Sequence, residues 1–250
     1  MKKFVKILAV VMIVALSATL LFACGGQEDT GREKLIMGTN AAFPPYEYYE
    51  GDKIVGIDAE VGALIAEKLG MDFEIQDMDF NGIISAVQNG VVDIGMAGMT
   101  VREDRLEHVN FSTTYAKGVQ VVIVKEGSAI ATLDDLAGKL IGVQEATTGD
   151  AYASEDYGEE SVKRYTNGAA AVAALQSGIV DAVIIDNEPA KAFVAANEGL
   201  TILETAYADE DYAIAVAKEN TELLEKINTA LAELTADGSI DAIVNKYIPA

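Results

Sequence analysis

From Leu35 onward, short apolar runs alternate with segments whose apolar residues recur at the spacing of a helix. The segment 57–70 shows this spacing clearly, because its apolar side chains fall on one helical face and Gly70 follows them. The pattern predicts strands over 35–39, 72–78 and 91–98, helices over 57–70 and 81–90, and a polar helical turn over 102–109. This alternation is typical of a parallel sheet with helices on its faces.

A second series of the same kind begins at Gly118. It predicts strands over 118–124, 140–144, 161–165, 180–186 and 201–205, and helices over 147–157, 168–178 and 188–197. A final amphipathic segment places Leu223, Leu224, Ile227, Leu231 and Leu234 on one stripe before Gly238. Two such series predict an α/β protein made of two lobes.

The N-terminal segment has the pattern of an export signal. Lysines come first, an apolar run follows, and small residues lead to Cys24. The ending LFAC (21–24) resembles the lipobox of bacterial lipoproteins, which are cut before the cysteine. We therefore expect a signal peptide over 1–23, then a lipidated Cys24 and a flexible tether over 24–34, so that a lipid anchors the domain to the cell membrane. The alternative is an uncleaved membrane anchor, which would hold the domain outside the same membrane.

Charge and composition limit the partners. The chain of 250 residues has a formal net charge of −22, and such a surface repels nucleic acid and anionic lipid headgroups. One cysteine, Cys24, and one histidine, His108, cannot form a disulfide or a metal cluster within one chain. We expect no cofactor, and any catalysis would have to use carboxylates, hydroxyls or lysines.

Chemically useful residues follow several of the predicted strands, where open α/β sheets bind their ligands. Arg105 comes soon after the strand 91–98, and a guanidinium can form a two-pronged contact with a carboxylate. Thr148 lies at a predicted helix N-terminus, which suits the same carboxylate. Asp186 ends the strand 180–186, where an acid can bind an ammonium. Together these residues predict a clamp for a zwitterion.

Each of these residues also has a simpler interpretation. Arg105 could form a surface ion pair with Glu103 or Asp104, and Asp186 could cap the next helix. The segment 40–46, which is rich in aromatic residues and proline, could be a packed loop and not an apolar wall for a small solute. The residues alone leave these alternatives open.

Several motifs in order resemble one known family. They are GTNAAFPPYEY (38–48), GIDAEVGALIAEKLG (56–70), MDFNGIISAVQNGVVDIGMAGMTVREDR (78–105), IIDNEPA (184–190) and DGSIDAIVNKY (237–247). Together they resemble the polar amino acid-binding proteins of ATP-driven (ABC) importers, which are bacterial extracellular solute-binding proteins of family 3. The resemblance covers nearly all of residues 35–250.

The resemblance implies a two-lobed periplasmic-binding-protein fold that closes around its ligand. The first lobe would comprise residues 35–114 and 213–250, and the second would comprise residues 119–207. The crossovers near 115–119 and 208–212 would act as hinges.

The resemblance also implies the ligand-binding residues, which are Asn40, Phe43, Phe80, Gly98, Thr100, Arg105, Gln144, Thr148 and Asp186. Arg105 would bind the α-carboxylate with the amides of Gly98, Thr100 and Thr148. Asp186 would bind the α-ammonium with the Gly98 carbonyl and the Thr100 hydroxyl. The two phenylalanines would enclose the side-chain stem, and Asn40 and Gln144 would contact its tip.

Asn40 bears on which amino acid is bound. Members that bind cationic side chains often carry an acid at this position, so an amide favours a neutral polar ligand such as glutamine, with arginine or lysine next. For a cationic ligand, Glu47, Glu145 or Asp150 could supply negative charge.

The expected function is therefore that of an extracytoplasmic binding protein, and not of an enzyme. It would be a monomer that closes on a free amino acid and delivers it to an ABC permease. One alternative is a dehydratase on the same fold, with Glu145 as the candidate general acid. The other is a sensory module that reports an amino acid to a separate membrane receptor.

Overall fold

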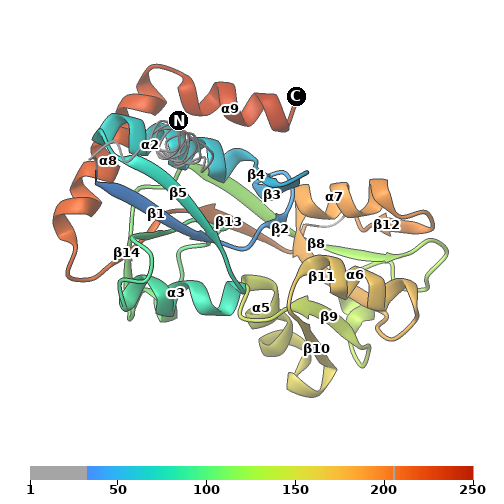
Figure 1. Ribbon diagram of the computed structural model, residues 1–250. Coiled ribbons are helices and arrows are strands. Elements are labelled where there is room, and N and C mark those ends of the chain that lie inside the picture. Colours follow the sequence, from blue (N-terminus) through green and yellow to red (C-terminus); the bar gives the residue numbers. More distant parts are fainter. Residues whose placement is uncertain (1–32, 205, 250) are drawn as a thin grey trace, which may run out of the picture. The chain divides into compact units, whose positions relative to one another are not determined.

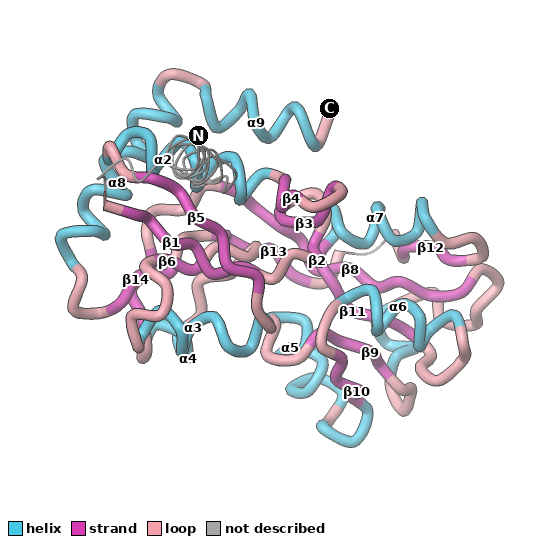
Figure 2. Tube along the Cα trace, viewed as in Figure 1, coloured by secondary structure: helices cyan, strands magenta, loops and turns pink. Residues whose placement is uncertain are grey.

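The computed structural model describes residues 33–204 and 206–249 (Figure 1). The predicted signal peptide, Cys24 and the tether up to residue 32 lie outside the described residues. Among the residues that are described, no helix is long and apolar enough to cross a membrane. Figure 2 shows that helices and strands alternate along most of this part of the chain.

The first large sheet contains the N-terminal strands. Its order is β5 (Asp72–Asp77), β1 (Lys34–Thr39), β6 (Ile94–Gly95), β14 (Ala215–Ala217) and β7 (Val109–Phe111). The strand β1 lies between β5 and β6 and runs parallel to both, whereas β14 is antiparallel to β6 and β7. The sheet is therefore mixed, although the sequence pattern predicts a parallel one.

Helices cover both faces of this sheet (Figure 1). On one face, α2 (Ile57–Leu69) packs against β5 and against α8 (Thr221–Ala236) and α9 (Ser239–Tyr247). On the other face, α3 (Phe80–Gln88) packs against β1, β6 and β14. The helix α2 ends where predicted, because Gly70 adopts a left-handed conformation (φ 71°) that closes the last turn.

The second large sheet contains the strands of the second series. Its order is β10 (Val162–Tyr165), β9 (Ile141–Gln144), β11 (Ala182–Asp186), β8 (Ala116–Lys125) and β12 (Leu200–Ile202), and β13 (Ala208–Tyr212) also pairs with β8. The strands β10, β9 and β11 are parallel, and β8 is antiparallel to β11, β12 and β13. The helices α5 (Thr148–Tyr157), α6 (Gly168–Gln176) and α7 (Asn187–Ala196) pack on this sheet.

The segments that connect the two sheets lie side by side. The strands β8 and β13 pair so that Ala116 is opposite Tyr212 and Gln120 is opposite Ala208. Just before β8, the amide of Tyr115 donates to the carbonyl of Tyr212 at 3.0 Å. The predicted hinge segments 115–119 and 208–212 are thus neighbours, while their role as hinges and the lobe boundaries remain predictions.

Two predicted elements differ from those observed. The segment 91–98 forms ladder pairs only at Ile94–Gly95, and the backbone bends at 91–93 and 97–98. The segment 40–46, which was expected to be a loop, contributes to a small antiparallel sheet of β2 (Ala42–Phe43), β3 (Glu47–Glu50) and β4 (Lys53–Val55). Phe43 and Tyr46 pack inward from this hairpin sheet, and their burial fixes the position of the segment.

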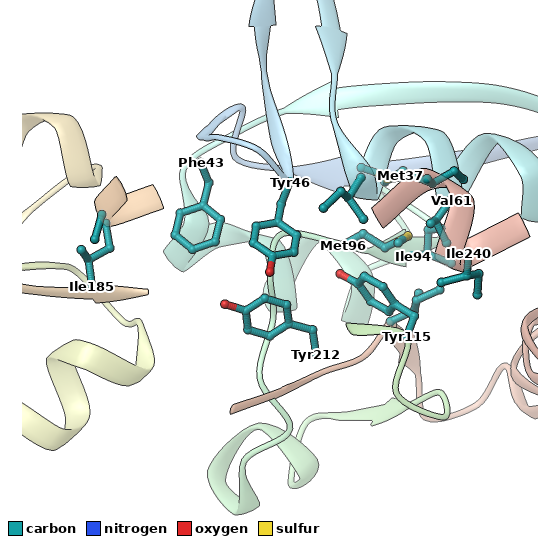
Figure 3. Close-up of a cluster of buried hydrophobic side chains, with 14 of the residues drawn as sticks. Met37, Phe43, Tyr46, Val61, Ile94, Met96, Tyr115, Ile185, Tyr212 and Ile240 are labelled. Atoms are coloured by element: carbon teal, nitrogen blue, oxygen red, sulfur yellow. The ribbon is translucent and has the colours of Figure 1, made fainter. Parts of the chain in front are cut away.

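The hydrophobic core extends into the region between the two large sheets through aromatic residues. Figure 3 shows Met37, Val61 and Ile94 packed behind three tyrosines, Tyr46, Tyr115 and Tyr212. All three tyrosines are buried, and the ring centres of Tyr46 and Tyr212 lie 5.1 Å apart in an edge-to-face arrangement. These rings lie next to the candidate site, where Tyr46 packs against Phe43.

Candidate ligand-binding site

A small cavity lies where the strands β1, β6, β9 and β11 end. Its total empty volume is about 330 Å³, which includes the space open to solvent. All of the ligand-binding residues predicted from the sequence line it. The full lining consists of Asn40, Phe43, Glu47, Phe80, Ala97, Gly98, Thr100, Arg105, Gln144, Thr147, Thr148 and Asp186. The structure therefore brings the predicted residues together, while their contact with a ligand remains a prediction.

Arg105 lies in the short helix α4 (Glu103–Leu106), with 3% of its surface exposed. Its Nη1 donates to the carbonyl of Thr100 at 2.8 Å, and its Nη2 donates to the carbonyl of Ala146 at 3.0 Å. The guanidinium carbon lies 5.3 Å from the centre of the Phe80 ring. Burial, with a further contribution from the neighbouring Arg102, lowers the pKa of Arg105 to about 10, so the side chain remains cationic at neutral pH.

The alternative of a surface ion pair for Arg105 does not hold. Asp104 pairs with Arg102 instead, at 2.8 Å. The two carbonyl contacts of Arg105 use two of the five N–H donors that a guanidinium carries. The remaining donors are available to a carboxylate in the cavity.

Asp186 ends the strand β11 and is also buried. Its Oδ2 accepts a hydrogen bond from the amide nitrogen Nε2 of Gln120 at 2.7 Å, and its Oδ1 accepts one from the hydroxyl of Tyr212. Burial raises the pKa of Asp186 to about 7; the Tyr212 hydroxyl and the Gln120 amide oppose this rise, and the nearby Glu210 adds to it. Asp186 occupies the N-cap position of α7, but its side chain makes no capping hydrogen bond, so the capping alternative is wrong.

The Thr100 and Thr148 backbones face the cavity for different reasons. Thr100 pairs with Tyr212 in an isolated antiparallel bridge whose hydrogen bonds come from the flanking residues. Its own N–H and C=O therefore point away from β13, and the C=O accepts from Arg105. Thr148 is the first residue of α5, where amide groups have no partner within the helix. Its neighbour Thr147 caps this helix by accepting from the amide of Asp150 at 3.3 Å.

Gly98 differs from the expectation in one respect. Its amide donates to Oδ2 of Asp58 at 2.9 Å, so this N–H is already used and only its carbonyl is left for a ligand. The glycine is required by packing, because it has a left-handed φ of 51° and an added Cβ would lie 2.7 Å from the Phe43 ring.

Phe43 and Phe80 supply the aromatic wall of the cavity, and Asn40 and Gln144, which are expected to contact the tip of the ligand's side chain, supply two amides. Phe43 packs on Tyr46 with ring centres 5.8 Å apart, and Phe80 begins α3. At the tip, Nε2 of Gln144 donates to Oδ1 of Asn40 at 3.0 Å, and Nδ2 of Asn40 donates to the carbonyl of Met78 at 2.9 Å. The side-chain oxygen of Asn40 therefore accepts from Gln144, and its second acceptor position is left for a ligand.

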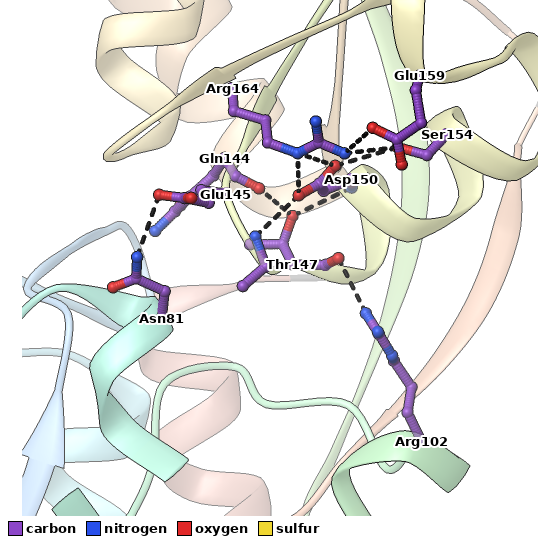
Figure 4. Close-up of polar contacts among 10 residues, drawn as sticks. Asn81, Arg102, Gln144, Glu145, Thr147, Asp150, Ser154, Glu159 and Arg164 are labelled. Atoms are coloured by element: carbon purple, nitrogen blue, oxygen red, sulfur yellow. Dashed lines mark hydrogen bonds and ion pairs between the residues drawn. The ribbon is translucent and has the colours of Figure 1, made fainter. Parts of the chain in front are cut away.

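The three acids proposed as counter-charges have different places. Glu47 lines the cavity and is buried; burial, followed by the neighbouring Asp58, raises the pKa of Glu47 well above its usual range. Asp150 does not line the cavity, because its carboxylate accepts from the Ala146 amide and pairs with Arg164 (Figure 4). Glu145, the candidate general acid of the dehydratase alternative, also lies outside the lining.

Polar contacts join the two halves of the site. Figure 4 shows Nδ2 of Asn81 donating to Oε2 of Glu145 at 3.1 Å, and Nη1 of Arg102 donating to the Thr147 carbonyl at 2.9 Å. The Arg105–Ala146 and Gln144–Asn40 contacts also run between the first and the second large sheet. These bonds exist only while the two halves face each other closely.

Sequence reasoning missed several buried polar residues next to the cavity. Gln120 interrupts an apolar strand, and Glu210 and Tyr212 alternate with exposed acids along β13. A buried polar residue inside an apolar run was the available signal for Gln120. The described residues contain no cluster of three or more histidine, cysteine or acidic side chains suited to a metal ion.

Comparison with known proteins defines the class. The chain belongs to the bacterial extracellular solute-binding proteins, family 3, whose family model matches residues 35–250. The family resemblance and the two-lobed fold predicted from the sequence are thereby confirmed.

Particular relatives carry more specific names. The arginine-binding extracellular protein ArtP of Bacillus subtilis is 34% identical over 99% of this chain and 98% of its own length. An ancestral arginine-binding protein, solved bound to glutamine, is 42% identical with a TM-score of 0.83, over 88% of this chain and 99% of that one. The arginine-, lysine-, histidine-binding protein ArtJ of Geobacillus stearothermophilus is 34% identical with a TM-score of 0.83, over 87% of this chain and 96% of that one.

Proposed function

We propose that this protein captures a free amino acid in the cavity between its lobes and delivers it to an ABC permease. The observation that carries the proposal is the pair Arg105 and Asp186, two buried groups of opposite charge that line one cavity, the first from helix α4 and the second from the end of strand β11. Arg105 would bind the α-carboxylate, together with the amides of Thr100 and Thr148. Asp186 would bind the α-ammonium, with the carbonyl of Gly98 beside it. Charged groups in a closed site bind strongly only when their hydrogen bonds are satisfied, and the α-carboxylate and α-ammonium of an amino acid would satisfy those of Arg105 and Asp186.

Arginine is the amino acid that we place first, and glutamine is second. The tip of the cavity offers the acceptor oxygen of Asn40, and a guanidinium has five donors to satisfy such acceptors. The face of Phe80, already in contact with one guanidinium, suits another planar cation. The net charge of −22 also attracts a cationic ligand. The order from the sequence alone, which put the neutral side chain first, is reversed here because of these features and the names of the relatives.

Capture would involve closure of the two lobes about the paired strands β8 and β13. The contacts between Arg102 and Thr147 and between Asn81 and Glu145 are compatible with a closed arrangement. A ligand that bridges Arg105 and Asp186 stabilises closure, because its two ends reach both groups only when the lobes are together. The permease would then distinguish the closed from the open form.

A thermal-shift screen of the twenty common amino acids tests the proposal. A ligand that binds only the folded state raises the Tm, by about 2.7 kcal/mol of added stability at a concentration of 100 times Kd. We expect the largest shift with arginine, a smaller one with glutamine, and no shift with either in the Asp186→Asn variant. If no amino acid shifts the wild-type protein, the proposed function is wrong.

We also propose that Cys24 carries the lipid anchor. The proposal is supported by the LFAC segment at 21–24 and by the apolar run before it. Intact-mass measurement of protein extracted from membranes tests it. A chain that begins at Cys24 and carries added acyl mass is expected, whereas a chain that still begins at Met1 would refute it.

A further inference from the structure

The carboxylate of Asp186 is held by neutral donors from two neighbouring strands. Gln120 in β8 donates to one oxygen at 2.7 Å, and the hydroxyl of Tyr212 in β13 donates to the other. Tyr212 is fully buried, and Gln120 is nearly so. Neither residue belongs to the lining of the cavity, so both contact Asp186 from the side away from the cavity.

Gly118 makes the contact between Tyr212 and Asp186 possible. It lies in β8 opposite Glu210, two residues from Gln120 and next to the path of the Tyr212 side chain. A Cβ at position 118 would overlap the hydroxyl oxygen of Tyr212 and would lie 2.9 Å from Oδ1 of Asp186. Any larger side chain would therefore displace the phenol from the acid. The backbone here has no positive φ, so space is the only reason for glycine.

We propose that Tyr212 is a positioning residue for the amino acid site, which orients Asp186 and keeps it in the ionised form that receives the ligand's ammonium, and that Gly118 provides the space this contact needs. The inference rests on the proposed function, because it takes Asp186 as the ammonium-binding group. It extends that function to two residues that no ligand has to touch.

The neutral character of the donors is what makes them suitable. A carboxylate has about four positions at which it can accept a hydrogen bond, and the two donors occupy one on each oxygen. The rest stay free on the side that lines the cavity. A lysine or arginine in place of Tyr212 would neutralise Asp186 and compete with the ligand. A phenol and an amide stabilise the charge without cancelling it.

Tyr212 also contacts elements of the first lobe. Its ring meets that of Tyr46 edge to face, and its backbone pairs with Thr100 and accepts from the amide of Tyr115. Figure 3 shows the hydroxyl of Tyr46 pointing toward Tyr212. The position of the phenol thus depends on the hairpin sheet and on the loop after β6. Movement of the lobes would move it relative to Asp186.

Other charged and titratable groups surround Asp186 and must be considered in any pH experiment. Glu210 shares its strand face with Tyr212, Glu47 and Tyr46 come from the hairpin sheet, and Arg105 comes from α4. The acids Asp186, Glu210 and Glu47 disfavour one another's ionisation, and Arg105 favours it. Removing the Tyr212 hydroxyl takes away a group that lowers the pKa of Asp186, so that pKa rises further above about 7.

The experiment compares Tyr212→Phe with wild type by calorimetric titration with L-arginine, and with L-glutamine, at pH values from 6 to 9. Phenylalanine keeps the ring against Tyr46 and removes only the hydroxyl. We expect the affinity of the variant to fall by about tenfold at pH 7, and the pH below which binding weakens to move up by about one unit. Gly118→Ala is expected to reproduce both changes, because it displaces the same hydroxyl.

Tyr207→Phe is the matched control. Tyr207 lies in the same connection, just before β13, and its hydroxyl also donates to an aspartate, Asp156, but this pair lies away from the cavity. Its removal should leave both the affinity and the pH profile unchanged.

The outcomes separate this inference from the proposed function. If Asp186→Asn abolishes binding but Tyr212→Phe has the affinity and pH profile of wild type, Tyr212 is not a positioning residue and the inference fails. A Tyr212→Phe variant that binds more weakly by the same factor at every pH would also refute it. Such a loss would be structural only, because the pH below which binding weakens would not have moved. If Asp186→Asn binds normally, the proposed site itself is wrong.

Discussion

The two charged groups of the site are both buried, but the protein holds them in opposite ways. Arg105 is held by two backbone carbonyls, one from its own lobe and one from the loop before α5. Asp186 is held by two side-chain donors, both from strands of the connection between the sheets. The acceptors of Arg105 are backbone carbonyls, which are present whatever the side chain at their positions. The donors to Asp186 are side chains, and a single substitution can remove either of them.

The difference extends to protonation. Burial lowers the pKa of Arg105 to about 10, which leaves the group charged across the physiological range. Burial raises the pKa of Asp186 to about 7, which is within that range. The comparison teaches that the carboxylate end of the ligand should be bound in a pH-independent way, while the ammonium end makes binding sensitive to pH.

The largest effect is expected from Arg105→Ala. The change removes the only arginine that lines the described cavity and leaves the ligand's carboxylate without its partner. Losing one partner of a buried, hydrogen-bonded charge pair costs about 2–5 kcal/mol, so the affinity for arginine should fall by about 30-fold or more. Calorimetry measures the loss, and circular dichroism should show an unchanged fold. Near-normal affinity would mean that the carboxylate is bound elsewhere.

The pH dependence of binding tests the proposed contact between Asp186 and the ligand's ammonium. The ionised form of Asp186 is the one that binds an ammonium, so affinity should be constant above pH 7 and fall by about tenfold for each unit below it. The stability of the ligand-free protein depends on pH with the opposite sign. Because the folded-state pKa is raised above 3.8, ionised Asp186 destabilises the ligand-free protein above pH 7, and this effect disappears as the pH falls toward 3.8. Titrations at pH 5.5 to 8.5 would contradict the account if affinity did not change.

A smaller effect, on selectivity, is expected from Asn40→Asp. The substitution replaces the acceptor oxygen at the tip of the cavity by a carboxylate close to the ligand's side chain. Binding of arginine should improve relative to that of glutamine by about tenfold, since a hydrogen bond to a charged group contributes about 1.5–3 kcal/mol and a neutral one about half of that. Competition between the two amino acids gives the ratio directly. An unchanged ratio would show that the side chain of the ligand does not reach Asn40.

The smallest effect is expected from Arg102→Ala. Its guanidinium crosses between the lobes to the Thr147 carbonyl but does not line the cavity, and it is partly exposed. One such contact contributes about 0.5–1.5 kcal/mol, so affinity should fall by about two- to tenfold through faster dissociation. The variant is also the matched control for Arg105→Ala, because both remove an arginine that reaches across the lobes. A loss of affinity as large as that of Arg105→Ala would contradict the view that Arg102 only helps the lobes to close while Arg105 contacts the ligand.

The sequence was sufficient to predict the site residues that follow strands. Arg105 and Asp186 both come shortly after an apolar run, and the rule that ligands bind at the carboxyl ends of strands brings them together without knowledge of their distance. The family motifs added Asn40, Phe43 and Phe80. The alternation of apolar runs and helical segments was likewise enough to predict two α/β lobes.

The rest depended on contacts between distant parts of the chain. Nothing near Gly98 in the sequence indicates that its amide is taken by Asp58, and nothing near Tyr212 indicates that its hydroxyl reaches Asp186. Asp150 looked free to serve a ligand until the fold brought Arg164 beside it. The mixed character of both sheets was also hidden, because the apolar pattern of β8 and β14 does not show that these strands run antiparallel to their neighbours.

The most direct test is a crystal structure of residues 33–250 with bound L-arginine. The account predicts that the α-carboxylate lies within hydrogen-bond distance of the Arg105 guanidinium and that the α-ammonium contacts a carboxylate oxygen of Asp186, with the Tyr212 hydroxyl still on the other oxygen. A ligand whose carboxylate and ammonium are both bound by a single lobe, or one that lies outside this cavity, would contradict it.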